Sequence, residues 1–70
     1  MKIKKVSNNI KDLRHKNGDM SQQELADLVG CSRQTINALE KNRYSPSYVL
    51  VKRIAVVFNV NTDDVLQIEF

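Results

Sequence analysis

The chain has 70 residues and carries eleven Lys or Arg and eight Asp or Glu, which gives a net charge of +3. A chain this short buries too small a fraction of its surface to enclose an enzyme-sized cavity. Its single cysteine, Cys31, and its single histidine, His15, exclude an intramolecular disulfide and a zinc finger. We therefore expect one domain spanning residues 1–70, held together by packing alone, with no metal and no cofactor.

Charge is unevenly distributed along the chain. Residues 1–53 hold all eleven bases and five acids, whereas residues 54–70 hold three acids and no base. A polyanion is attracted to the first part and repelled by the second, which favours a nucleic-acid-binding face opposite a C-terminal region with another use. The longest apolar run, Ile54 to Phe58, is too short for a signal peptide or a membrane span. We expect a cytoplasmic protein without a membrane partner.

The chain ends and the first helix are predicted from short patterns. Residues 2–6 and 66–70 each have the alternating or apolar character of a short strand, so the two segments are expected to pair, the alternative being frayed ends. A helix begins at the polar cluster Ser7–Asn9 and ends at Asn17-Gly18 in a left-handed turn. Its inward side chains are Ile10 and Leu13.

The second and third helices lie close together in the sequence. Ser21 and Glu24 form a capping box at the start of the second helix, which ends at Gly30. Ser32 caps the third helix, so only three residues separate the two helices and they must cross steeply. The apolar face of the second helix consists of Leu25, Ala26 and Val29.

Two further helices complete the chain. Residues 44–46, ending in the only proline, stop the third helix, and Ser47 caps a fourth. Asn61 or Thr62 caps a short fifth helix, whose acidic first turn suits the positive end of the helix dipole. The inward side chains of the fourth helix are Leu50, Val51, Ile54, Ala55 and Phe58. The sequence thus predicts a compact all-α domain of five helices with a small two-stranded antiparallel sheet made by the termini.

The third helix has one apolar and one polar side. With about 100° per residue from Arg33, Ile36 falls at about 300° and Leu39 at about 240°. The opposite arc, between 0° and about 140°, carries Arg33, Gln34, Asn37, Ala38 and Lys41. Of these, the Arg, Gln and Asn side chains can make paired hydrogen bonds to base edges in the major groove. Because they gather at the helix start, where a groove-inserted helix carries its base contacts, the pattern favours DNA recognition.

Residues 21–40, SQQELADLVGCSRQTINALE, resemble the helix-turn-helix of the phage-repressor and Cro (Xre) family. The resemblance extends over about residues 10–66, with the helix-turn-helix itself at about 22–41, and is greatest to very short single-domain repressors such as the cytolysin-type repressor. It implies a lambda-repressor-like fold and a transcriptional regulator, a repressor, that binds double-stranded DNA. The operator is then a pseudo-palindrome with half-sites roughly 34 Å apart.

The resemblance also assigns roles to individual positions. Arg33, Gln34 and Ala38 fall where the family reads bases, and Asn37 lies on the same face. The positions at which the family contacts phosphate are Gln22, Ser32, Lys41, Asn42 and Arg43. Phosphate contacts fix register and give salt-dependent affinity, whereas base contacts give sequence preference. Arg14 and Glu40 match a family ion pair between the first and third helices, which is expected to be structural.

Val49, Val56 and Val57 widen the apolar stripe of the fourth helix beyond what a small core needs. A self-complementary patch of this kind is most often used by a twofold dimer. We therefore expect a homodimer with these valines at the interface and the base-poor C-terminal part near the axis. Neither a small-molecule ligand nor a pocket for one is expected.

Several alternatives are weaker. An antitoxin-type module that holds a protein partner and regulates its own promoter would share this fold, but it usually needs an additional surface or tail. The acids are scattered at helix ends, and no nucleophile, base and orienting group converge, so the chain is not expected to be an enzyme. Cys31 and His15 are expected to be a plain turn residue and a surface residue. The basic segment at residues 2–5 is a candidate DNA-contacting arm, although solvated basic termini are common.

Overall fold

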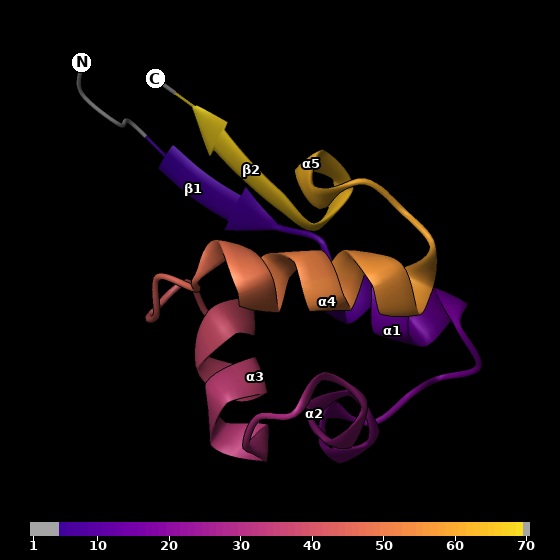
Figure 1. The fold of residues 1–70 in the computed structure, drawn as a ribbon. Coiled ribbons are helices and arrows are strands. Elements are labelled where there is room, and N and C mark those ends of the chain that lie inside the picture. The colour runs from indigo at the N-terminus through magenta and orange to yellow at the C-terminus, as the bar shows by residue number, and fades with distance from the viewer. Residues whose placement is uncertain (1–4, 70) are drawn as a thin grey trace.

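The computed structural model describes residues 5–69, and it has the predicted five helices and two-stranded antiparallel sheet. In chain order the elements are β1 (Lys5–Asn8), α1 (Ile10–Lys16), α2 (Gln22–Val29), α3 (Arg33–Glu40), α4 (Tyr48–Phe58), α5 (Thr62–Val65) and β2 (Leu66–Glu69). Figure 1 shows α2 end-on and α3 side-on, so their axes cross steeply below α4, while the sheet lies above α4.

The capping residues begin most helices as the sequence predicts. The Ser21 hydroxyl accepts from the Glu24 amide at 3.0 Å, and the Glu24 carboxylate accepts from the Ser21 amide at 3.3 Å, which confirms the capping box. Ser32 and Ser47 likewise accept from the third amide of α3 and α4. At α5 the cap is Asn61 rather than Thr62.

The core consists of residues predicted to point inward and of Val65, which was not predicted. Leu25, Ile36 and Ile54 are fully buried, and each contributes about 1.5–3 kcal/mol through burial. The remaining buried apolar residues are Ile10, Ala26, Val29, Leu39, Leu50, Val51, Ala55, Phe58 and Val65. Leu13 is half-buried against this core. Helices from both ends of the chain therefore meet around one hydrophobic centre.

The sheet differs from the prediction in its first strand. The strand was expected at residues 2–6, but β1 runs on through Ser7 and Asn8, which pair with Gln67 and Leu66. Only Asn9 of the Ser7–Asn9 cluster is therefore left to precede α1, and its side chain makes no capping hydrogen bond. The long-range pairing with β2 outweighs the local capping preference of these residues. Residues 2–4 and 70, which belong to the predicted strands, lie outside the described residues.

The turn between α1 and α2 uses two residues with positive φ. Gly18 has φ 75° and Asp19 has φ 53°, so the left-handed conformation expected at Asn17-Gly18 continues into the next residue.

Among the helices that the structure describes, none combines the length and the apolar character needed to cross a membrane.

Candidate nucleic-acid interface

The turn between α2 and α3 sets where the third helix begins. Gly30 adopts the left-handed conformation at φ 78°, and its amide donates to the Ala26 carbonyl at 2.9 Å. The Cys31 amide donates to the same carbonyl at 3.0 Å. Ser32 is in an extended conformation and caps α3 at the Thr35 amide. Three residues are thus enough to change the direction of the chain steeply between the two helices, and α3 starts with the exposed Arg33.

One side of α3 faces away from the core. Arg33 and Gln34 are exposed, Asn37 and Ala38 are half-buried, and Ile36 on the opposite side is fully buried. The structure therefore brings the four residues predicted to read bases onto one accessible surface. Arg, Gln and Asn can each make paired hydrogen bonds to a base edge, and the Ala methyl can contact a thymine methyl.

A short basic loop continues this surface. Lys41, Asn42 and Arg43 are exposed, and Asn42 has a left-handed backbone at φ 56°. The Arg43 amide returns to the Ala38 carbonyl at 2.9 Å, which closes the end of α3. The backbone of the residues predicted to contact phosphate here is therefore held beside the C-terminal end of α3. The side chains of Lys41 and Arg43 form no hydrogen bond or ion pair with other residues in the range 5–69.

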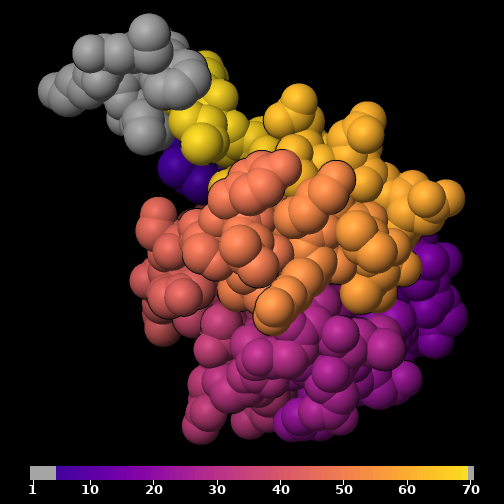
Figure 2. All heavy atoms as spheres, in the orientation of Figure 1, coloured from indigo at the N-terminus to yellow at the C-terminus, as the bar shows by residue number. Residues whose placement is uncertain are grey.

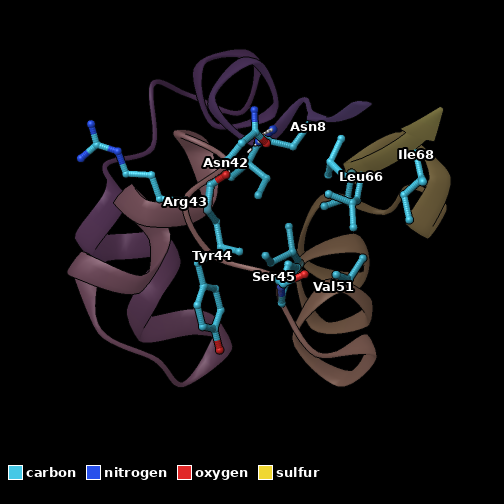
Figure 3. A pocket seen from close by; sticks show the side chains of 14 residues that line it. Asn8, Asn42, Arg43, Tyr44, Ser45, Val51, Leu66 and Ile68 are labelled. Atoms are coloured by element: carbon cyan, nitrogen blue, oxygen red, sulfur yellow. Dashed lines mark hydrogen bonds between the residues drawn. The ribbon is translucent and has the colours of Figure 1, made fainter. Parts of the chain in front are cut away.

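Asn8 connects this loop to the terminal sheet, and the sequence analysis missed that role. Its Nδ2 donates to the Leu39 carbonyl and to Asn42 Oδ1, both at 2.9 Å, while its Oδ1 accepts from the Ile10 amide at 3.2 Å. One side chain thereby fixes the end of α3, the loop and the start of α1 (Figure 3). Only its position in the predicted capping cluster could have drawn attention to it.

The surface is positively charged, and its cations form no ion pair with any residue of the described range 5–69. Within residues 5–69 the ion pairs are Arg14 with Glu40 and the exposed His15 with Asp19 at 3.3 Å. Arg33, Lys41 and Arg43 therefore have no carboxylate within 4 Å in the described part of the chain. Unpaired Arg and Lys on one face give the electrostatic attraction that phosphate groups require.

Arg14 and Glu40 tie α1 to the end of α3. Arg14 Nε donates to Glu40 Oε2 at 2.7 Å and Nη2 donates to Oε1 at 3.0 Å, with side chains only 8% and 7% exposed. Arg14 Nη1 also donates to the Met20 carbonyl at 2.7 Å. The hydrogen bond to the Glu40 carboxylate raises the pKa of Arg14, and burial acts in the opposite direction. The bidentate geometry fixes the orientation of α3 against α1.

Gln22 is half-buried and turned toward other side chains. Its Nε2 donates to Asn37 Oδ1 at 3.2 Å and to Glu40 Oε1 at 3.1 Å. Both of its hydrogen-bond donors are therefore occupied, so a contact from its amide group to phosphate, which accepts only, requires one of these bonds to break. The phosphate contact of Gln22 was assigned from the family resemblance alone, and it stays a prediction.

The predicted dimer valines and an apolar groove occupy other surfaces. Val49 and Val56 are 57% and 66% exposed on α4, whereas Val57 is half-buried against the core. Helix α4 fills the front of the molecule between the α2–α3 pair and β2 (Figure 2). A groove of about 420 Å³, which the sequence did not predict, lies between the sheet, the loop after α3 and α4 (Figure 3). The exposed apolar side chains that line it include Val6, Tyr44 and Ile68.

The remaining predicted residues have ordinary surroundings. Cys31 is half-buried in the turn, and burial raises the pKa of its thiol, which keeps it protonated at neutral pH. His15 is exposed on α1. Within residues 5–69 no group of three or more His, Cys, Asp or Glu is arranged to hold a metal ion. Of the basic arm at residues 2–5, only Lys5 is described, and it is exposed in β1.

Two helices joined by a three-residue turn, with the second helix exposed along its polar side, define a helix-turn-helix domain. A family model described as helix-turn-helix matches residues 10–65. The protein belongs to this Xre-like helix-turn-helix family.

Three similar proteins carry the same type of name. An uncharacterized HTH-type transcriptional regulator of Bacillus subtilis, YgzD, is 39% identical over 64 residues, which cover 91% of this chain and 96% of that protein. An uncharacterized HTH-type transcriptional regulator of Archaeoglobus fulgidus is 48% identical over 56 residues, or 80% and 78% of the two chains. One of Methanothermobacter thermautotrophicus is 64% identical over 36 residues, or 51% and 52%.

Proposed function

We propose that this protein is a sequence-specific DNA-binding transcriptional regulator that inserts α3 into the major groove. The observation that carries the proposal is the accessible surface formed by Arg33, Gln34, Asn37 and Ala38, continued by the unpaired cations of Lys41 and Arg43. The names of its relatives support the same function. Base contacts at the start of α3 would give sequence preference, and the basic loop would hold the backbone.

The proposal separates base contacts from phosphate contacts, and variants test the separation. Arg33→Ala should reduce the preference for the bound sequence, because a bidentate contact to guanine contributes roughly 1–3 kcal/mol of discrimination. Arg43→Ala should weaken binding to all DNA alike and lower the slope of log K against log salt concentration by about one. Lys11→Ala, on the exposed side of α1, is the matched control that removes one charge elsewhere. Equal effects of all three variants would contradict the assignment.

We further propose that the protein acts as a repressor and resembles the very short repressors of the family, such as the cytolysin-type repressor. Occupying a promoter is enough to block transcription, so no additional contact surface is required for this mode of action. An operator can be obtained by selecting bound sequences in vitro, and a reporter gene placed under its control should be expressed less when the protein is present. Higher expression would identify an activator instead.

We propose in addition that two copies bind a pseudo-palindromic operator as a homodimer. The exposed Val49 and Val56 lie seven residues apart on α4, and therefore on one ridge, which supports the predicted contact. Half-burial of Val57 gives it a lesser share of that contact. Val56→Asp should shift the protein to a monomer in analytical ultracentrifugation and weaken operator binding. If Ile68→Asp does so and Val56→Asp does not, the groove beside the sheet is the interface and the α4 assignment is wrong.

A further inference from the structure

A chain of hydrogen bonds runs from the buried Arg14 to the exposed side of α3. Arg14 donates to Glu40, Gln22 donates to Glu40 Oε1 at 3.1 Å, and Gln22 donates to Asn37 Oδ1 at 3.2 Å. The guanidinium can only donate and the carboxylate that it holds can only accept. Gln22 must therefore turn its amide nitrogen, and not its oxygen, toward Glu40.

The orientation of the Gln22 amide in turn determines the orientation of the Asn37 amide. Because one Nε2 group of Gln22 serves both Glu40 and Asn37, its neighbour must present an oxygen to it. The amide of Asn37 is consequently oriented with Oδ1 toward Gln22 and Nδ2 away from it. Chemistry fixes this orientation, since the opposite one would place two donors against each other.

The Nδ2 group of Asn37 is free to bind something else. None of the hydrogen bonds among the described residues uses it, and no buried side-chain nitrogen or oxygen in residues 5–69 lacks a partner. Asn37 Nδ2 is therefore accessible to solvent, on the same half-exposed surface as Ala38 and one turn from Arg33. It carries two hydrogens that can only donate.

We propose that Gln22 is a positioning residue that makes Asn37 a reader of hydrogen-bond acceptors, guanine N7 or O6 first of all, in the major groove. This proposal rests on the proposed DNA-binding function. The usual paired contact of Asn with adenine needs the amide oxygen to accept from adenine N6 while the nitrogen donates to N7. With Oδ1 directed at Gln22, that contact would require the Asn37 amide to turn over and lose its bond to Gln22. Guanine, which presents two acceptors and no donor there, needs no such change.

The test compares bound DNA sequences selected in vitro by the full chain and its variants. The position that loses its preference in Asn37→Ala is the one that Asn37 reads, and in the wild type it should be guanine. Gln22→Met removes both donors at similar volume, so the discrimination of guanine from adenine should fall by on the order of 2- to 10-fold, the equivalent of one hydrogen bond. Gln22→Glu places an acceptor against Asn37 but also a second carboxylate against Glu40, so it should lose the preference for guanine as Gln22→Met does. Gln23→Glu, an exposed neighbour, is the control for charge.

A second measurement needs no variant that alters folding around Gln22. Replacing the guanine with 7-deazaguanine removes N7, and replacing it with 2-aminopurine removes O6; at least one of the two should weaken binding by the wild type but not by Asn37→Ala. The proposal is overturned if the Asn37-dependent base is adenine, if the folded Gln22→Met protein keeps the wild-type preference, or if Asn37→Ala changes no position while Arg33→Ala does. If the wild type enriches no sequence at all, the proposed function itself fails, which is a different result.

Discussion

Removing Arg14 should destabilise the protein strongly, because it leaves the Glu40 carboxylate buried without its charge partner. The Arg14→Ala variant loses both bonds to Glu40 and the bond to the Met20 carbonyl, and the Glu40 side chain is only 7% exposed. Breaking a buried pair of this kind costs about 3–5 kcal/mol. A domain of this size has a total stability of roughly 4–10 kcal/mol, so the variant should be marginal.

The assay is unfolding followed by circular dichroism at 222 nm, in urea and on heating. For a small domain each kcal/mol shifts the midpoint by about 4–8 °C, so Tm should fall by on the order of 15 °C or more. Lys16→Ala, at an exposed position of the same helix, should change stability by less than about 0.5 kcal/mol. Replacing both partners with Met should recover much of the loss, since no unpaired charge remains. A Tm of Arg14→Ala equal to that of the wild type would refute this reasoning.

Three further predictions concern other parts of the fold. Asn8→Ala should lower the free energy of unfolding by about 1–3 kcal/mol, because the Leu39 carbonyl and the Ile10 amide lose their partner, and urea titration measures the change. Gly30→Ala should cost about 1–2 kcal/mol, since an L residue is strained at φ 78° although its methyl has room, and Tm reports it; a neutral result would contradict the strain argument. Cys31 should react with iodoacetamide at pH 7.5 more slowly than free cysteine, because its pKa is raised, whereas an equal rate would show a normal thiolate.

The helices and the core could be predicted from the sequence because their determinants are local. The Ser21 capping box, the glycine at position 30 and the apolar spacing of α4 each act within one or two turns of helix. The exposed face of α3 followed from the same periodicity. In each of these cases, the residues that stabilise the structure are the same residues that make the pattern recognisable in the sequence.

The features that could not be predicted depend on contacts between distant residues. β1 extends to Asn8 because residues 66–69 lie beside it, and Asn8 reaches a carbonyl 31 positions further along the chain. The contacts of Gln22 depend on the relative position of α2 and α3 and on which way an amide is turned. Neither leaves a periodic or compositional signal in the sequence.

The central claim is that the exposed start of α3 reads DNA sequence. In vitro selection from random duplexes, run in parallel with the wild type and Arg33→Ala, tests it most directly. The wild type should enrich a pseudo-palindrome with half-sites one helical turn apart, and Arg33→Ala should lose preference at one symmetric pair of positions while the rest of the motif persists. Enrichment of the same complete motif by both proteins, or of no motif by the wild type, would contradict the claim.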